Sequence, residues 1–223
     1  MMLRGLAALF LAAGSGDEID SARYTRALFE DAFDGPSLGK SWKSYKSAST
    51  IRDGVLVGIE PPDAGHNSVN SIDVPPVGDL AVDLKFKFAG AKRFAIAFND
   101  RLYKGAHAGH ICRVTFDVAS ITYQDDRDGV FKNEIYEKKK AGGQVDPTLL
   151  KGKTLKLPAQ FEEGRWYAVS LRIQGDLMQV LLDGRPQGEF RSSGVGHVEK
   201  RNVALVVSGR ELHVDDLKVR AAP

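Results

Sequence analysis

Apolar and polar residues alternate along most of this chain, and a period of two is the pattern of a β-strand with one buried face. In VGDLAVDLKFKF the apolar positions that share one face are Leu80, Val82, Leu84, Phe86 and Phe88. The pattern recurs, between clusters of Gly, Asp, Asn and Pro, in RFAIAFND, HICRVTFD, SITYQ, RWYAVSLRIQ, LMQVLLDG, RNVALVVSG and LHVDDLKV. So many antiparallel strands predict an all-β sandwich or jelly roll of two antiparallel sheets. The Lys- and Gly-rich stretch from about 129 to 156 is expected to be a long excursion with one or two short strands.

Composition limits the size, the partners and the redox chemistry of this fold. A chain of 223 residues with 43% hydrophobic content is long enough to bury one sizeable core. Its 31 basic and 29 acidic residues are too evenly balanced for a nucleic-acid partner to be expected. The single cysteine, Cys112, excludes an intramolecular disulfide and a cysteine-based zinc site. Because Cys112 alternates with core positions in HICRVTF, we predict a small buried hydrophobe.

The N-terminus has the pattern of a short secretory signal. Arg4 precedes the apolar stretch LAALFLAA, and GSGDE follows it, so residues 1–15 are predicted to be a signal peptide cleaved after Ser15. An ordinary amphipathic N-terminal helix is the alternative. The apolar stretch is too short to span a bilayer, which needs roughly 20 residues. The sequence therefore predicts an exported protein without a membrane span, with a linker at 16–27 and one domain at 28–223.

Several strand motifs, in this order, resemble a known family. They are LFEDAFDG, then Trp42, IRDGVLVG, GDLAVDLKFKF, GRWYAVSLRIQGDLMQVLLDGR and VDDLKV. Together they resemble the concanavalin A-like lectin/glucanase jelly rolls and, more narrowly, the 3-keto-disaccharide hydrolase domain family, over residues from about 28 to 220. The resemblance implies a carbohydrate partner. Trp166 begins a strand in the long motif, where packing is favoured over stacking on a sugar.

The carboxylate pair of a family 16 glycosidase is not found. Such enzymes carry their catalytic carboxylates on alternate positions of one strand. EIDSAR, at residues 18–23, lacks the second glutamate and precedes the first strand. In NEIYEKK, Glu134 and Glu137 are three apart and would point to opposite faces of a strand. A standard retaining glucanase is therefore not expected.

The strands in the middle of the chain indicate a binding face. If Phe94, Ile96 and Phe98 face the core, then two small residues, Ala95 and Ala97, face outward between polar neighbours. In jelly rolls of the resembled class the concave sheet is the usual sugar site. An ordinary half-exposed sheet face is the alternative. The expected ligand-binding residues are Arg93, Asn99, His107, Arg113, Thr115, Gln124 and His66.

The segment FNDRLYKGAHAGHICRV contains the candidate catalytic residues. A 3-keto sugar has an acidified proton next to its ketone, so a positioned base can start elimination of the glycosidic oxygen without a carboxylate pair. We expect His110 to act as the base and Arg113 to stabilise the enolate, and Asp100 is a third candidate catalytic residue in the same cluster. By strict alternation, however, His110 shares a face with Cys112, and a structural histidine is the alternative.

The resemblance also implies a structural calcium ion between the first and last strands. Asp31, the carbonyl of Gly54 and Asp215 would provide three oxygen ligands. The alternative is that Asp215 and Asp216 only cap a surface strand. No glycine fingerprint of a cofactor site is present. Two functions remain open: an exported carbohydrate-binding module, and a hydrolase or lyase that cleaves 3-keto-glycosides.

Overall fold

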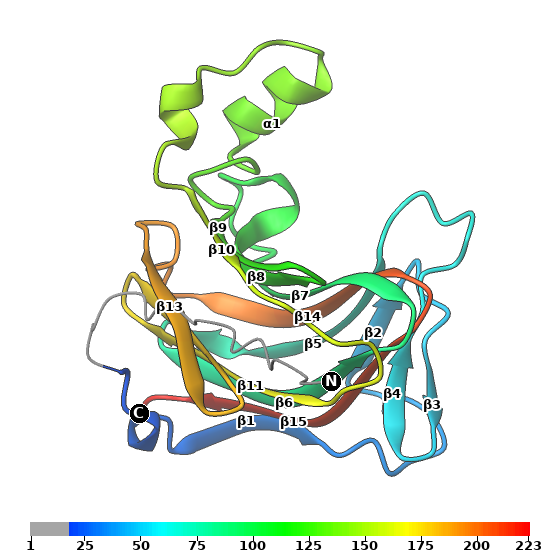
Figure 1. The fold of residues 1–223 in the computed structure, drawn as a ribbon. Helices are drawn as coiled ribbons and strands as arrows, with labels where there is room; N and C mark the ends of the chain where they lie inside the picture. The colour runs from blue at the N-terminus through cyan, green and yellow to red at the C-terminus, as the bar shows by residue number, and fades with distance from the viewer. Residues whose placement is uncertain (1–17) are drawn as a thin grey trace, which may run out of the picture.

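The computed structural model describes residues 18–223, and the predicted signal peptide at 1–15 lies outside them. The described chain forms two antiparallel sheets that pack face to face, as Figure 1 shows. One sheet contains β1 (Arg26–Asp31), β3 (Thr50–Arg52), β4 (Val55–Gly58), β6 (Leu80–Phe88), β11 (Tyr167–Gln174), β12 (Leu177–Leu182), β13 (Arg185–Arg191) and β15 (Leu212–Ala221). The other contains β2 (Trp42–Tyr45), β5 (Ser68–Val77), β7 (Ala91–Asn99), β8 (His110–Asp117), β9 (Ser120–Asp125), β10 (Thr154–Pro158) and β14 (Lys200–Gly209).

Strands that are far apart in sequence are neighbours in both sheets. In the eight-stranded sheet the order is β13-β12-β11-β6-β15-β4-β3, and β1 also pairs with β15. In the seven-stranded sheet the order is β10-β9-β8-β7-β14-β5-β2. This confirms the predicted all-β jelly-roll sandwich of two antiparallel sheets. Within the described chain, no helix is long and apolar enough to cross a membrane.

Aromatic side chains from both sheets form the centre of the core. The ring of Phe86 lies 5.2 Å from Phe94 and 5.2 Å from Phe116, and 5.7 Å from Tyr167. Burial of each such side chain contributes roughly 1.5–3 kcal/mol, and offset aromatic pairs add to it. Cys112 is fully buried in this core, as predicted, and burial raises the pKa of its thiol to about 12.

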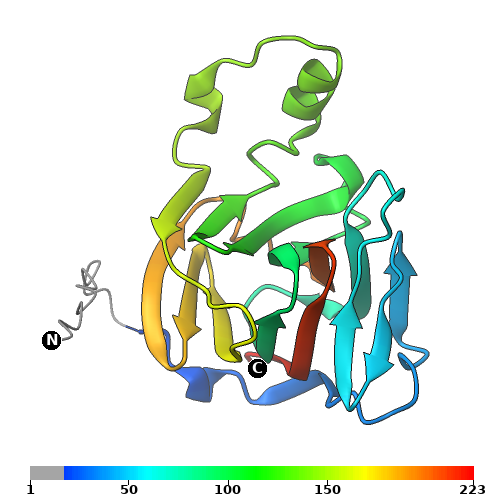
Figure 2. The same cartoon turned by 45° about the vertical axis from the view of Figure 1, so that its right-hand side comes forward.

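The excursion between β9 and β10 differs from the prediction. It contains the helix α1 (Asn133–Lys140) and a short 3-10 helix at Pro147–Leu150, followed by the predicted short strand, β10. Figures 1 and 2 show it rising from the end of the seven-stranded sheet. Because the segment is helical, Glu134 and Glu137 lie on the same side rather than on opposite faces, and both are exposed.

Residues 18–25, inside the predicted linker, pack on the eight-stranded sheet. Ile19 and Tyr24 are 3% and 2% exposed. The backbone N–H of Ile19 donates to Gln179 at 2.7 Å, and the Tyr24 hydroxyl donates to the carbonyl of Ile173 at 2.9 Å. This segment is therefore held on the domain by buried contacts.

Candidate functional site

The outer face of the seven-stranded sheet carries a row of small residues across three neighbouring strands. Phe94, Ile96 and Phe98 are in the core, so their alternating neighbours face outward, as predicted. Ala97 lies opposite Ala204 of β14, which lies opposite Ser71 of β5. These three residues are only 2–3% exposed. Flanking side chains therefore stand above them, and a ligand on this face would first contact those flanking groups.

A polar row runs beside the small residues. Asp73, Asn202 and Asn99 are aligned by strand pairing, and Asn99 is paired with His110 on β8. The register shifts between Phe98 and Asn99, so that Ile111 is an extra residue on β8. This bulge turns His110 onto the outer face with Asn99. The expectation from strict alternation, that His110 shares the core face with Cys112, is therefore wrong.

The hydrogen bonds of this row determine which ring nitrogen of His110 carries the hydrogen. The Asn202 amide nitrogen donates to the carbonyl of Ile72 at 3.0 Å and to Asp73 at 2.9 Å. Its oxygen therefore faces Asn99, whose amide nitrogen donates to it at 3.0 Å. The Asn99 oxygen in turn accepts from His110 Nδ1 at 2.7 Å. His110 is therefore the Nδ1–H tautomer, and its Nε2 has no hydrogen-bond partner among residues 18–223.

His110 is neutral in this environment. Burial, together with the positive charges of Arg113, His107 and His66, lowers its pKa to about 3. The unprotonated Nε2 is thus present throughout the physiological pH range. A low pKa also makes this imidazole a weak base, so proton abstraction would depend on strong stabilisation of the negative charge that develops.

Arg113 supplies a cation next to His110 and keeps one donor unused. Its Nε donates to Asp126 at 2.5 Å, and Gln124 donates to the same carboxylate at 2.5 Å. The buried Nη2 of Arg113 has no partner in the described chain. Asp126 is fully buried, and burial outweighs the attraction of Arg113 to raise its pKa. Asp126 is not among the site residues expected from the sequence.

Aromatic rings from the excursion stand beside His110. The Phe131 ring centroid lies 4.6 Å from that of His110, and the Arg113 guanidinium lies 4.9 Å from the Phe131 centroid. His107 stacks on Tyr136 of α1 with centroids 3.8 Å apart and an interplanar angle of 12°. His107 was expected among the ligand-binding residues, but the sequence contained no signal for Phe131 or Tyr136, because a helix had not been expected there.

Other predicted site residues are more dispersed. Thr115 and Gln124 lie on the same outer face, next to Ala95 and Arg113 in the register. Arg93, at the far end of β7, is paired with Asp117 at 2.7 Å. His66, in the loop before β5, is exposed and contacts Tyr45 edge-on.

Asp100 lies in a separate cluster. Its carboxylate accepts from the backbone N–H of Leu102 at 2.9 Å and contacts His197 at 3.0 Å and Arg201 at 3.3 Å. Burial opposes ionisation of Asp100, but the hydrogen bonds from His197 and Leu102 and the positive charges nearby outweigh it and lower its pKa. None of these contacts involves His110. Asp100 therefore fixes the loop after β7, and the structure does not bring it to the outer face.

Two of the predicted calcium ligands, Asp31 and Asp215, lie on the paired strands β1 and β15, but the Asp31 carboxylate already has other partners. Its carboxylate accepts from the backbone N–H of Phe33 at 2.8 Å and from Trp42 Nε1 at 2.7 Å. Asp215 accepts from the N–H of Asp216 at 2.7 Å, and Gly54 follows Asp53 in the turn between β3 and β4. Within residues 18–223, no three His, Cys, Asp or Glu side chains converge to hold a metal. Calcium stays a prediction.

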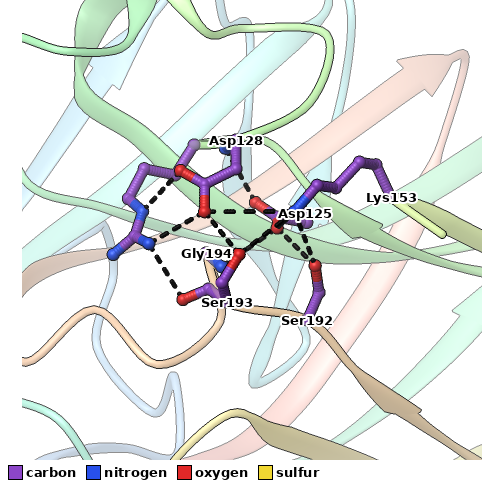
Figure 3. Close-up of polar contacts among 7 residues, drawn as sticks. Asp125, Asp128, Lys153, Ser192, Ser193 and Gly194 are labelled. Atoms are coloured by element: carbon purple, nitrogen blue, oxygen red, sulfur yellow. Dashed lines mark hydrogen bonds and ion pairs between the residues drawn. The ribbon is translucent and has the colours of Figure 1, made fainter. Parts of the chain in front are cut away.

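Both ends of the excursion are held by a cluster that the sequence did not reveal, shown in Figure 3. Asp125 is fully buried and accepts from Lys153 Nζ at 3.1 Å, Ser192 Oγ at 2.5 Å and the N–H of Gly194 at 3.0 Å. The N–H of Asp128 donates to it at 2.9 Å. We name Asp125, Asp128, Lys153 and Ser192–Gly194 the anchor cluster. It ties both ends of the excursion to the loop after β13.

The sandwich and the outer face together define a concanavalin A-like jelly roll, and comparisons with known proteins agree. The family model of the 3-keto-alpha-glucoside-1,2-lyase-like domain matches residues 28–220. The chain therefore belongs to this family. No curated protein sequence matches it.

Solved structures with the same fold share little sequence with this chain. The carbohydrate-binding module CBM66 from Bacillus subtilis is 12% identical with a TM-score of 0.57, over 81% of this chain and 96% of that one. A GlcNAcα1-4Gal-releasing endo-β-galactosidase from Clostridium perfringens is 12% identical with a TM-score of 0.59, over 92% of this chain and 64% of that one. A sialidase is 11% identical with a TM-score of 0.61, and the match covers 87% of this chain but only 18% of the sialidase.

Proposed function

We propose that the outer face of the seven-stranded sheet binds a carbohydrate, with a sugar ring against the side chains that flank the row of small residues at Ala97. The observation that supports this most directly is the polar row beside it, where His110 Nε2 and Arg113 Nη2 have no partner in residues 18–223. A buried donor such as Arg113 Nη2 costs free energy when it is left unpaired. Sugar hydroxyl and carbonyl groups are ligands of matching chemistry. Family membership supports the same class of ligand.

The specific reaction that we propose is the cleavage of a 3-keto-glycoside by 1,2-elimination. His110 Nε2 removes the proton from C2, next to the ketone, and the C2–H electrons form an enolate with the C3 carbonyl. Arg113 stabilises the negative charge on the C3 oxygen. Collapse of the enolate forms a C1–C2 double bond, breaks the bond from C1 to the glycosidic oxygen, and the departing alkoxide takes up a proton. The step needs no oxidant or metal, and no water is consumed in it.

A purely binding role is the second candidate, and one observation favours it. The pKa of His110, about 3, makes it a weak base, and a general base works best with a pKa near the operating pH. A jelly roll of this fold that binds without catalysis is represented among the structural relatives by CBM66, whose name describes a carbohydrate-binding module.

Product analysis distinguishes the two functions. The wild-type protein, His110→Gln and the control Ser208→Ala, at the opposite end of β14 from Asn202, are incubated with a 3-keto-α-glucoside disaccharide and with its unoxidised parent. Elimination by His110 predicts release of the leaving sugar from the keto substrate only, reduced about 10²–10⁴-fold in His110→Gln and unchanged in Ser208→Ala. No release by the wild type, with calorimetric binding of the keto disaccharide retained, supports the binding role. No release and no binding contradicts both.

We also propose that the protein is exported and that its mature chain begins near Gly16. Arg4, the apolar stretch LAALFLAA and the small residues after it support this. N-terminal sequencing of the protein from its native host is expected to give a start near Gly16. An intact Met1 would contradict the proposal.

A further inference from the structure

The outer face of the eight-stranded sheet, on the opposite side of the sandwich, has a hollow of about 610 Å³. It lies over β3, β4, β6 and β15 and is bounded by Trp166, directly before β11. The residues that line it are Arg52, Asp53, Val55, Val57, Lys85, Lys87, Trp166, His213 and Asp215. Pockets of roughly 300–1,000 Å³ are typical for small-molecule ligands.

Trp166 forms an aromatic wall of this hollow. Its side chain is 37% exposed, whereas Trp42, the other tryptophan, is 9% exposed and is held by Asp31. The Lys87 ammonium lies 4.9 Å from the centroid of Trp166, and the His213 ring lies 6.4 Å away at 57°. The expectation that Trp166 serves mainly for packing is therefore incomplete. The Lys87 side chain lies over the indole ring, and a lysine side chain of this kind can move away from it.

The charges around the hollow are mixed, and several of them are unpaired. Arg52 is bound to Glu211 at 2.9 Å, and Lys85 to Asp216 at 2.5 Å, so two of the three cations are already neutralised. Among residues 18–223, Lys87 and Asp53 have no ion-pair partner.

The hollow therefore offers one free ammonium group as a donor and two carboxylates, Asp53 and Asp215, as acceptors around an indole face. A neutral polyol can donate hydroxyl hydrogens to the carboxylates, accept from the ammonium, and place its C–H surface on the indole. An anion would be repelled by Asp53 and Asp215. We propose that this hollow is a second carbohydrate site that takes one or two neutral hexopyranose units. Lys87 leaves the indole face to donate to the sugar.

This site is independent of the proposed reaction, because it lies on the other sheet and shares no residue with the outer face of the seven-stranded sheet. Two sites on opposite faces let one molecule hold a polymeric or clustered glycan at two points. Binding at the second point then proceeds at a high effective concentration, so that weak sites give a stronger combined attachment.

The test uses the two tryptophans as reporters. Glucose, galactose, maltose and cellobiose are titrated at millimolar concentration while the indole N–H signals are followed by NMR. We expect the Trp166 signal to shift in a saturable way with at least one of these sugars, and the Trp42 signal to stay in place. In calorimetric titrations, which need no indole signal, Trp166→Ala is expected to weaken that binding at least about tenfold, and Trp166→Phe less.

Two controls make the outcome decisive. Ala97→Trp alters the outer face of the other sheet and is expected to leave the sugar titration at Trp166 unchanged. Glucuronate, a negatively charged analogue, is expected to bind more weakly than glucose because of Asp53 and Asp215. The proposal is overturned if no neutral sugar shifts the Trp166 signal, if Trp166→Ala binds as well as the wild type, or if glucuronate binds more tightly.

Discussion

Asp125 and Asp126 are consecutive, and both are fully buried, but their surroundings differ completely. Asp125, on the inner side of the sheet, accepts four hydrogen bonds within the anchor cluster, and the one from Lys153 is also an ion pair. Asp126 faces outward with two side-chain partners, Arg113 and Gln124. In the first environment every acceptor is occupied. In the second environment, burial raises the pKa of the Asp126 carboxyl group. The Nη2 of its partner Arg113 has no hydrogen-bond partner among residues 18–223.

This difference separates a polar cluster that supports the fold from one that has binding capacity left. A buried network in which every polar group is hydrogen-bonded holds its chain segments in place and has no unpaired group left to bind a ligand. An incompletely satisfied one costs stability, and such a cost is common at functional sites. The anchor cluster positions the excursion, and the excursion places Phe131 and Tyr136 beside His110 and His107. The first cluster thus supports the geometry of the second.

The largest expected effect is that of Asp125→Asn on stability. The amide keeps the size of the carboxylate, but it turns hydrogens toward donors and leaves the Lys153 ammonium without its buried partner. Breaking such a buried pair costs about 3–5 kcal/mol. Urea unfolding followed by circular dichroism measures it. Gly194→Ala is a second test, because an added Cβ would collide with the Asp125 carboxylate. A loss below about 1 kcal/mol in both variants would mean that the anchor cluster is not needed for the fold.

Asp126→Asn is expected to have a smaller effect on stability and a larger one on the proposed function. Because burial already disfavours the charged form of Asp126, we expect a loss of about 1–3 kcal/mol, the usual cost of unsatisfied buried partners. Arg113 loses its positioning partner, so turnover of the 3-keto disaccharide, or its binding, should fall further than in Asp125→Asn measured at equal folded fraction. The comparison between the two aspartates fails if Asp125→Asn loses more function and Asp126→Asn more stability.

Much of the fold was predictable because alternation is a local signal. The strands around Leu80–Phe88 and Phe94–Phe98 were assigned from their period of two, which the structure confirms. The helix α1 was not predicted, because NEIYEKKK has only one buried residue, Ile135, and no apolar stripe. Local sequence carries little information about such a segment, whose position depends on distant contacts.

The candidate site was predictable only in part. Ala97, Asn99 and Arg113 were assigned to one outward face, which the register confirms. His110 was not assigned to it by alternation, because one extra residue at Ile111 reverses the direction of every side chain beyond it. The partners of Asp125 also escaped notice, because Ser192 and Gly194 are 67 and 69 positions away.

The pH dependence of stability gives a third comparison of the two clusters. The folded pKa of His110, about 3, lies below its ordinary value of 6.5. The unfolded chain therefore binds a proton at a pH where the folded protein does not. The stability supplied by neutral His110 is complete above about pH 6.5 and is lost as the pH falls toward 3, by up to about 1.4 kcal/mol per unit.

His110→Gln should therefore flatten the stability curve between pH 6.5 and 4, because glutamine can still donate to Asn99 but does not titrate. Asp128→Asn in the anchor cluster is the matched control. The hydrogen bond from Arg127 is the largest cause that lowers the pKa of Asp128 to about 2. The stability that ionised Asp128 supplies is lost only below about pH 3.8. Asp128→Asn should therefore keep the wild-type slope of stability against pH above pH 4. Urea midpoints across the pH range measure both. Equal slopes for His110→Gln and the wild type between pH 6.5 and 4 would contradict the neutral, buried His110.

The smallest expected effect concerns calcium at Asp31, the carbonyl of Gly54 and Asp215. Calcium-binding modules outside cells often have dissociation constants of about 10⁻⁴–10⁻³ M, so about 1 mM calcium would add about 0.4–1.4 kcal/mol. Asp31→Asn separates the two roles of this carboxylate. In excess chelator its loss of stability reports the hydrogen bonds from Phe33 and Trp42, and any further loss in calcium reports ligation. Asp215→Asn should lose only the calcium-dependent part, because the Asn oxygen can still accept from the N–H of Asp216. If the melting curves of the wild type coincide in calcium and in chelator, the calcium prediction is wrong. Asp31 then serves only as a hydrogen-bond acceptor at the first strand, and its carboxylate has its partners within the fold, as that of Asp125 does.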